Sequence, residues 1–386
     1  MTQRSHSLPR RAVASWDYSW LLRRDGRATE YRDLGEVMGQ LVQRGFNALR
    51  IDPFPHLIAT NADGYESERF DVQAEPDRHG RGTDASVQVR PHKALLELLQ
   101  QAREHGVVLW LSSWFLPDSQ GRRHFVRQPR DFVRVWVETL EFIRENGFAA
   151  QVEAVDFCHQ FPLPPAAWGA ARRVFGRHPR RVLGLLRWDE RVCERVSEYT
   201  VEVPRALRAL FPDYYYGLSV PLSQWRNLPQ LDTGELDFID VHPWLQDDLQ
   251  FRLASGDLLQ GSGPALAGRL QQTVAARLYG LQTERWLTRA DERLAPALDF
   301  ARKRRLGVAM TEGYLRLERE RTAHWGWLQN VSEHMVVLAR AEQVPVMTPA
   351  LQARPHSELW QAEDWLAGIC ARILSEETPL ALSSAQ

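Results

Sequence analysis

A single carboxylate stands at the end of a short apolar segment in the C-terminal part of the chain. Residues 306–310 read Leu-Gly-Val-Ala-Met and are followed by Thr311, Glu312, Gly313 and Tyr314. An uncharged run of this kind is typical of a strand buried on both faces. Side chains at the C-terminal ends of parallel barrel strands face one shared pocket. Glu312 is therefore a candidate for chemistry, although a carboxylate paired with a nearby arginine is the ordinary structural alternative.

Other apolar segments also end in polar groups next to aromatic residues. The side chains at these ends are Trp16, Asp17, Trp20, Arg50, Asp52, His56, Ser113, Trp114, Asp156, His159, Gln160, Gln224, Trp225, His242, Trp244, Glu312 and Tyr314. Each has a structural explanation by itself, such as a barrel salt bridge for Arg50 or a satisfied core histidine for His242. Together they predict one pocket with aromatic platforms and many hydrogen-bonding groups, which suits a sugar. Arg50, Gln160, His242 and Glu312 are expected to contact a single sugar ring.

Eight apolar segments alternate with helical patterns along the chain, and these elements must position the pocket. The apolar segments begin near residues 12, 46, 107, 152, 214, 236, 306 and 344, and helical patterns cover 34–44, 91–105, 131–146, 187–211, 325–340 and 358–374, with a further helix before 306. This alternation indicates an α/β fold with a parallel sheet. Eight units without a strong linker predict a single (β/α)8 TIM barrel domain over residues 1–386. An open doubly wound sheet is the alternative, but no glycine-rich phosphate motif follows the first strand.

Two long segments separate these units, 61–89 after the second strand and 245–284 after the sixth. The first is rich in Asp, Glu, Arg and Gly and is expected to form an extended loop. Loops of this length in a compact domain are usually functional lids or disordered. Because the loops that follow barrel strands supply specificity, we expect both segments to overhang the mouth of the pocket.

Composition excludes several classes of protein. The 386 residues carry a formal net charge of −1, whereas nucleic-acid binding needs an excess of Lys and Arg. Cys158, Cys193 and Cys370 are too few and too scattered for a disulfide framework or a zinc site. The N-terminus lacks the apolar run of a signal peptide, and no stretch is long enough to span a bilayer. We expect a cytoplasmic protein without nucleic-acid or membrane partners, cofactor or metal; the oligomeric state stays open.

The strand-end pattern resembles a known family. An Arg after strand two, a His after strand six and a Glu after strand seven are similar to the retaining glycoside hydrolases of the cellulase-type barrel clan. The closer resemblance is to the cellulase-like (sugar-binding cellulase-like) family. It rests on residues 16–21 (Trp-Asp-Tyr-Ser-Trp-Leu), on 50–58 (Arg-Ile-Asp-Pro-Phe-Pro-His-Leu-Ile), on the residues around Asp156, on Thr311-Glu312 and on Trp325-Gly-Trp327.

This resemblance implies roles for individual residues. Glu312 would be the nucleophile, oriented by Arg50 and Tyr314, with His242 near the reacting centre. The remaining aromatic and polar strand-end residues, and Trp327, would bind a small oligosaccharide or glycoside. The clan also carries an Asn-Glu pair after strand four, in which the Glu is the acid/base. This chain has His159-Gln160 at that place.

The presence of Gln160 in place of the acid/base Glu matters because a retaining glycosidase uses two carboxyl groups about 5–5.5 Å apart. A glutamine has no proton to donate at physiological pH, and general acid–base catalysis is typically worth 10²–10⁴-fold in rate. Three outcomes fit. The protein binds sugars without cleaving them, or it cleaves substrates whose leaving group needs no protonation, such as thioglycosides. Otherwise His159, Asp156, Asp17 or Asp52 has become the acid, with His159 favoured because its pKa lies near neutral.

The sequence thus favours a glycoside-hydrolase-type barrel, with a non-catalytic carbohydrate-binding pseudoenzyme as the alternative. A metal-dependent isomerase or hydrolase on the same barrel is a third interpretation, with ligands among His56, His159 and His242. It ranks lower, since no short ligand motif such as HExxH is present.

Overall fold

The computed structural model describes residues 7–24, 28–60, 64, 67–73, 85–163, 168–176, 188–255, 277, 279–315, 325–350 and 353–376. Eight parallel strands form a closed barrel: β1 (Arg11–Asp17), β2 (Ala48–Ile51), β5 (Val108–Ser112), β6 (Val152–Asp156), β7 (Tyr215–Pro221), β8 (Phe238–His242), β9 (Gly307–Met310) and β10 (Val346–Met347). The first and last strands close it, with Arg11 opposite Val346. The prediction of a (β/α)8 barrel is confirmed.

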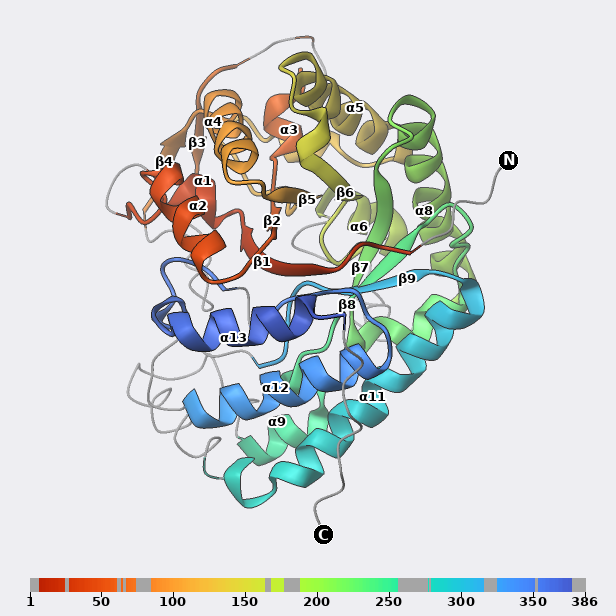
Figure 1. Ribbon diagram of the computed structural model, residues 1–386. Helices are drawn as coiled ribbons and strands as arrows, with labels where there is room; N and C mark the ends of the chain where they lie inside the picture. The colour runs from red at the N-terminus through yellow and green to blue at the C-terminus, as the bar shows by residue number, and fades with distance from the viewer. Residues whose placement is uncertain are drawn as a thin grey trace.

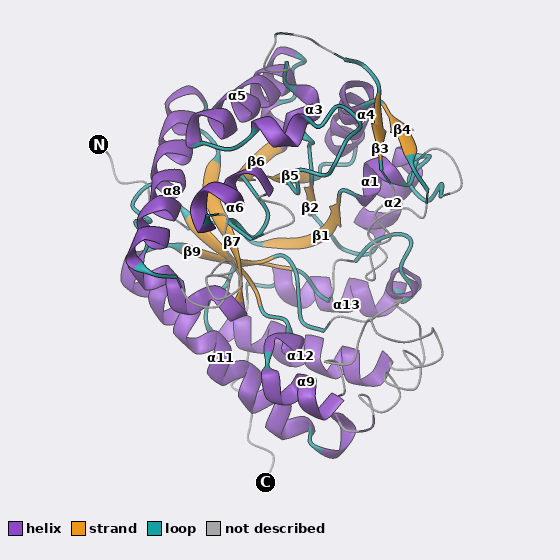
Figure 2. Ribbon diagram, turned by 180° about the vertical axis from the view of Figure 1, so that it is seen from behind, coloured by secondary structure: helices purple, strands orange, loops and turns teal. Residues whose placement is uncertain are grey.

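Helices surround the strands on the outside, as Figures 1 and 2 show. The longer ones are α2 (Leu34–Gln43), α4 (Pro91–Glu104), α5 (Pro129–Glu145), α8 (Glu190–Leu210), α11 (Thr283–Arg304), α12 (Trp325–Ala341) and α13 (Glu363–Leu374). The shorter ones include α1 (Ser19–Leu22), α3 (Pro55–Ile58), α6 (Trp168–Phe175), α9 (Leu249–Ser255) and the 3-10 helices η3 (Leu222–Gln230), η4 (Leu245–Asp247) and η7 (Glu358–Gln361).

The sequence around α5 shows why such a helix forms and which face it buries. Pro129 occupies its first turn, and Gln128 and Asp131 form a capping box that satisfies free backbone N–H groups. Its buried side chains recur every three or four residues, the spacing of one helical face: Phe132, Val135, Trp136, Thr139, Leu140 and Ile143. That face packs against the barrel, and Trp136 donates through Nε1 to the carbonyl of Phe157 at 2.9 Å.

Alternation along the strands divides the barrel interior into layers. One layer is mainly apolar and forms a compact cluster of Val13, Ala48, Trp110, Ala154, Phe238, Ala309 and Val346, capped by Leu8. Gly217 of β7 completes it without a side chain, because a Cβ there would lie 2.3 Å from the ring of Phe238. Large rings from β5 and β8 therefore fill the middle, with centroids 4.9 Å apart.

The next layer is polar. Since side chains of a strand alternate between its faces, the residues two positions further on also point inward. They are Ser15, Arg50, Ser112, Asp156, Ser219, Asp240, Thr311 and Thr348, all buried. A polar floor thus lies directly above the apolar layer, towards the C-terminal ends of the strands.

The long segments after the second and sixth barrel strands are only partly described. The first was expected to be an extended loop, but it contains an antiparallel hairpin of β3 (Phe70–Val72) and β4 (Val87–Val89). Bridging between Val72 and Asp118 ties this hairpin to the loop after β5. The second begins with η4 and α9. Much of both segments lies outside the described residues, namely 61–63, 65–66, 74–84, 256–276 and 278. The prediction that both segments overhang the pocket mostly concerns these residues and stays a prediction.

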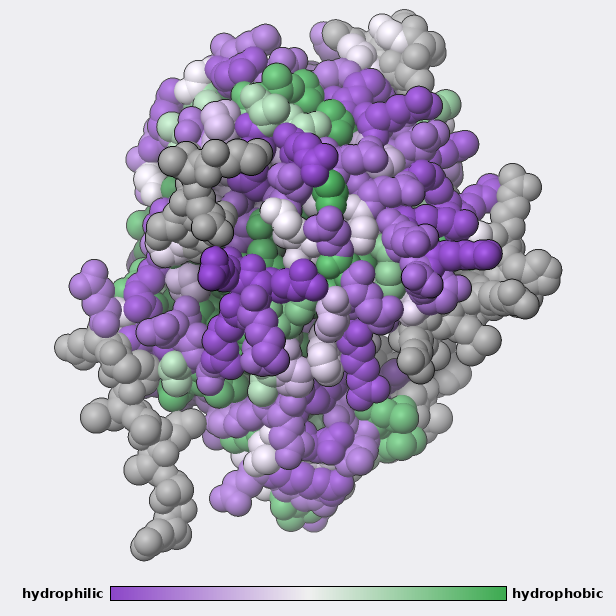
Figure 3. Space-filling model, turned by 90° about the vertical axis from the view of Figure 1, so that its right-hand side faces the viewer, coloured by the Kyte–Doolittle hydropathy of each residue, from purple (hydrophilic) through white to green (hydrophobic). Residues whose placement is uncertain are grey.

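One face of the molecule can be judged from its space-filling view. The face in Figure 3 is largely hydrophilic, with small scattered hydrophobic patches. Within the described residues, no helix combines the length and apolar character needed to cross a bilayer.

Candidate active site

Glu312 follows β9 by two residues and is almost fully buried, with 1 % of its surface exposed. Its Oε1 accepts a hydrogen bond of 2.6 Å from Nη1 of Arg50, which comes from β2 on the other side of the barrel. A charged pair buried to this extent has to be well hydrogen-bonded to be tolerated. The polar floor supplies those bonds.

Arg50 is the cation at the centre of this floor. Its Nη2 donates to Ser112 Oγ at 2.9 Å and lies 3.4 Å from Asp156, and its Nε lies 3.7 Å from Asp240. The guanidinium carbon sits 4.9 Å above the ring of Trp114. Burial by itself would lower the pKa of Arg50, but the charges of Glu312, Asp240 and Asp156 outweigh it and raise that pKa. Arg50 is therefore a fixed positive charge.

Two histidines flank Glu312. Nδ1 of His159 lies 3.7 Å from Oε1 and 3.1 Å from Nη2 of Arg50, and Nδ1 of His242 lies 3.7 Å from Oε2. The His159 ring stacks on Trp114 at 4.3 Å and lies next to the His242 ring at 5.3 Å. Nε2 of His242 is 3.2 Å from the carboxylate of Asp240. The histidines thus form one stack beside the carboxylate.

Gln160 joins the same cluster from the end of β6. Its backbone has a φ of 49°, in the left-handed region, and its N–H donates to Ser219 Oγ at 2.6 Å. This conformation directs its side-chain amide to His242, with Nε2 2.9 Å from Nδ1. Arg50, Gln160, His242 and Glu312 thus lie together at the C-terminal ends of the strands, as predicted, and their contact with one sugar ring stays a prediction.

The pKa values of the two floor carboxyl groups shift in opposite directions. Burial would raise the pKa of Asp240, but His242, Arg50 and the Thr311 hydroxyl at 2.5 Å hold it well below its usual range. Burial raises the pKa of Asp156, even though Arg50 and the hydroxyls of Ser112 and Ser219 oppose the shift. Asp240 is therefore the firm anion of this layer, and Asp156 binds a proton more readily.

Asp17 and Asp52, predicted to bind substrate, hold the loops at the ends of β1 and β2. Oδ1 of Asp17 accepts bonds of 2.7 Å from the backbone N–H and hydroxyl of Ser19, and Oδ2 lies 3.4 Å from Arg354. Asp52 accepts backbone bonds from Phe54 at 2.7 Å and Trp114 at 2.8 Å. Burial raises the pKa of Asp52 to about 7, against the effect of these bonds.

The predicted aromatic platforms divide into two groups. Trp114 belongs to the Glu312 cluster. Trp16 packs edge-on against Tyr31 at 5.2 Å, and Trp20 donates to the Asp52 carbonyl at 2.9 Å, so both pack beneath the loops at the ends of β1 and β2. Trp244 is buried, and its backbone bridges to that of Tyr314. The Tyr314 hydroxyl was expected to orient Glu312, but it donates to the Thr348 carbonyl at 2.9 Å.

Three predicted site residues contact other parts of the molecule. His56 is buried in α3, with Nε2 3.0 Å from the Leu116 carbonyl and its ring beside Phe115. Trp327 of α12 packs against Tyr279, with ring centroids 5.1 Å apart. Trp225 of η3 lines a surface groove together with residues of α11. Their substrate-binding roles stay predictions, and these contacts do not support them.

The sequence interpretation missed several members of the cluster. They are Ser112, Ser219, Asp240 and Thr311 in the floor, and Arg354, which pairs with Asp17. Strict alternation was the signal that could have found the floor residues, since Asp240 lies two positions before His242 on the same face of β8. Arg354 lies in the loop after β10 and carries no comparable signal.

A metal could in principle bridge His159, His242 and Glu312, whose donor atoms lie within 4.8 Å of one another. However, the guanidinium of Arg50 already contacts a donor atom of both His159 and Glu312. A cation at that position would face the positive charge of Arg50 at close range. The charge of Arg50 therefore disfavours a metal ion between these three residues.

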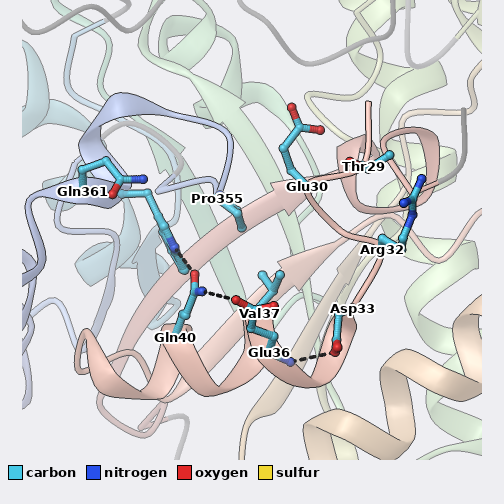
Figure 4. Close-up of a pocket in the computed structure, with 10 residues that line it drawn as sticks. Thr29, Glu30, Arg32, Asp33, Glu36, Val37, Gln40, Pro355 and Gln361 are labelled. Carbon is cyan, nitrogen blue, oxygen red and sulfur yellow. Dashed lines mark hydrogen bonds between the residues drawn. The ribbon is translucent and has the colours of Figure 1, made fainter. Parts of the chain in front are cut away.

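A separate cavity of about 410 Å³ lies beside α2 (Figure 4). Its polar side chains serve the fold. Asp33 caps α2 by accepting from the Glu36 N–H at 2.9 Å, and Gln40 donates to Glu36, as Figure 4 shows. Gln40 also accepts from Trp360 Nε1 at 2.9 Å. Glu30 pairs with Arg23 at 2.6 Å. This cavity is therefore not a second candidate site.

Comparison with known proteins decides the family. The model of the family described as "Sugar-binding cellulase-like" matches residues 13–374. The chain belongs to this cellulase-like family. The predicted resemblance is thus confirmed, and the barrel is of the glycoside-hydrolase type. A search of curated proteins finds no match.

Solved structures agree on the fold of this cellulase-like chain. A putative glycoside hydrolase from Parabacteroides distasonis is 21 % identical with a TM-score of 0.79, and the match covers 98 % of this chain and 97 % of that one. A family 5 mannosidase from Rhizomucor miehei is 9 % identical with a TM-score of 0.52, covering 95 % and 93 %. At these identities the likeness concerns the barrel alone.

Proposed function

We propose that this cellulase-like barrel is a retaining glycoside hydrolase that acts on a small sugar or glycoside, with Glu312 as its nucleophile. The observation that carries the proposal is the state of Glu312 at the end of β9. It is buried, one oxygen is fixed by Arg50 at 2.6 Å, and the other faces His242. Family membership and the carbohydrate-active relatives of the same fold support this assignment.

Arg50 gives Glu312 the two properties that a nucleophile needs. The buried positive charge favours the ionised carboxylate, and the charge-assisted hydrogen bond fixes its orientation. Ser112 and Asp156 hold the guanidinium in turn. The reaction then begins when a Glu312 oxygen attacks the anomeric carbon and the bond to the leaving group breaks.

The decisive experiment measures turnover of aryl glycosides by the wild-type protein and by Glu312→Gln. We expect the wild type to release the aryl group and to retain the anomeric configuration. The substitution should reduce turnover by at least about 10³-fold while leaving sugar binding largely intact, because the amide keeps the shape and loses the nucleophile. Equal turnover by both proteins would contradict the proposal.

A non-catalytic sugar-binding protein is the second candidate, and one observation favours it. Gln160 occupies the place of the acid/base carboxyl and cannot donate a proton. Binding of cello- and manno-oligosaccharides in calorimetry, without turnover of any aryl glycoside, would support this candidate over the first.

A further inference from the structure

The proposed hydrolysis needs a side chain that gives and takes up a proton, and Gln160 cannot. The following inference rests on that proposed function and names this side chain. His159 and His242 are the histidines within 3.7 Å of Glu312 in the described part of the chain. Their surroundings differ, and the difference decides between them.

His159 is poorly placed to be the acid. Its Nδ1 lies 3.1 Å from Nη2 of Arg50, a nitrogen that is permanently protonated and can only donate. Nδ1 must therefore accept, which leaves the neutral imidazole with its proton on Nε2. A second proton on Nδ1 would face the guanidinium directly, at a large electrostatic cost. The expectation that His159 replaces the missing acid is thus not supported by its contacts.

His242 has the opposite surroundings. Nε2 lies 3.2 Å from the Asp240 carboxylate, so this nitrogen donates and the tautomer is fixed. A proton on Nδ1 would then make an imidazolium between Asp240 and Glu312, whose Oε2 is 3.7 Å away. Such an imidazolium would place a second positive charge, beside that of Arg50, next to these two buried carboxylates.

We propose that His242, paired with Asp240, is the proton donor and acceptor of this site in place of the carboxyl that Gln160 lacks. In the first step, a Glu312 oxygen bonds to the anomeric carbon, the bond to the leaving-group oxygen breaks, and that oxygen takes the Nδ1 proton. In the second step, water attacks the anomeric carbon and gives a proton to Nδ1. The bond to Glu312 breaks, and both the carboxylate and the imidazolium are restored.

Gln160 completes this arrangement. Its amide nitrogen lies 2.9 Å from Nδ1 of His242. The imidazole therefore lies next to the place after the fourth barrel strand where related enzymes carry their acid/base Glu. An amide can turn its oxygen towards Nδ1–H or its nitrogen towards a bare Nδ1, and it therefore accommodates both protonation states. The 3.7 Å between Nδ1 and Glu312 is shorter than the roughly 5–5.5 Å between the carboxyl groups of retaining enzymes. We therefore expect one water molecule beside the amide to relay the Nδ1 proton to the leaving-group oxygen.

The test compares phenyl and 2,4-dinitrophenyl glycosides of glucose, mannose and cellobiose, because the dinitrophenyl group leaves without protonation. For His242→Asn we expect kcat/KM on the phenyl substrate to fall at least 100-fold, and on the dinitrophenyl substrate by no more than about 3-fold. Azide should raise the variant's kcat on the dinitrophenyl substrate and yield a glycosyl azide of retained configuration.

The pH profile gives an independent readout. Asp240 of β8, Glu312 after β9 and His159 after β6 face His242, and Arg50 of β2 lies 3.7 Å from Asp240. In the wild type, kcat/KM on the phenyl substrate should fall on the alkaline side, because this leaving group needs a proton donor. This decrease at alkaline pH should be absent from both His242→Asn and His242→Gln. The second variant is included in case the first does not fold.

His159→Asn is the matched control, since it removes the neighbouring imidazole. It should lower kcat/KM on both leaving groups by the same factor. The His242 assignment would be overturned if a His242 variant lost kcat/KM equally on both leaving groups while Glu312→Gln was inactive. The proposed function would then still stand. Turnover that survives Glu312→Gln, or a wild type that cleaves no aryl glycoside, would overturn both.

Discussion

Arg50 concentrates the electrostatics of the site on one side chain. Its guanidinium contacts Glu312 at 2.6 Å, Asp156 at 3.4 Å and Asp240 at 3.7 Å, and it remains charged at any accessible pH. The single positive charge of Arg50 therefore lies at a different distance from each of the three carboxyl groups. This arrangement explains how Glu312, the proposed nucleophile, can stay ionised in a buried floor beside Asp156, whose pKa burial raises.

At the same scale, Gln160→Glu should add the missing carboxyl. We expect kcat/KM on phenyl glycosides to rise at least tenfold, because the new acid lies near the Glu312 charge and a like charge raises its pKa into a useful range. Steady-state kinetics with phenyl and dinitrophenyl substrates would measure this gain.

A double variant checks whether the two positions share one role. If the introduced carboxyl takes over proton transfer in Gln160→Glu, then adding His242→Asn should cost much less than it costs the wild type. An unchanged phenyl-glycoside rate in Gln160→Glu would contradict the idea that a proton donor is what this position lacks.

At the scale of the elements, a regular inward alternation builds both layers of the barrel. The apolar layer needs Gly217, because Phe238 fills the space that a side chain from β7 would occupy. The polar layer follows two residues later with Ser219 and Asp240. Substitution in the lower layer therefore displaces the strands that carry the site.

We expect Gly217→Ala to destabilise the protein by about 1–3 kcal/mol, since its Cβ would lie 2.3 Å from the Phe238 ring. Gly368→Ala in α13 is the matched control: nothing lies within 4 Å of its added Cβ. That helical position should gain about 0.5–1 kcal/mol. Urea unfolding measures both, and equal stabilities would contradict the layered packing.

The strands and their order were predictable, whereas parts of the site were not. Short uncharged runs such as 306–310 identify a buried parallel strand, and eight of them identify the barrel. The polar ends revealed Arg50, His242 and Glu312. Trp225 was expected to bind sugar for the same reason, and Trp327 because of the family resemblance. An aromatic residue also suits packing between elements, and the sequence does not distinguish these two uses.

At the scale of the whole molecule, His56 links stability to pH. It is buried, and burial lowers its pKa from 6.5 to about 4. Between these values the unfolded chain binds a proton that the folded protein rejects, so stability falls as pH drops from 6.5 towards 4. The slope approaches about 1.4 kcal/mol per pH unit, or about 3 kcal/mol in all.

Asp52 has the opposite effect on how stability depends on pH. Its pKa is raised to about 7, so the folded protein binds a proton there that the unfolded chain releases. The His56 contribution is therefore measured as a difference between wild type and His56→Gln, by urea unfolding at several pH values. The amide can still donate to the Leu116 carbonyl. We expect the wild type to lose stability relative to the variant as the medium is acidified, and parallel curves would rule out a buried neutral imidazole.

Barrel closure by β10 has a consequence for how the protein is made. β1 pairs with β2 on one side and with β10 on the other, and the β10 pairing joins residues more than three hundred positions apart. On the ribosome, the edges of β1 and β9 stay open until residues 346 and 347 have emerged from the exit tunnel. Until then the nascent chain exposes unpaired strand edges, which are prone to pair with other chains and aggregate. Glu312 and Arg50 face each other across a closed barrel only after β10 has emerged and paired.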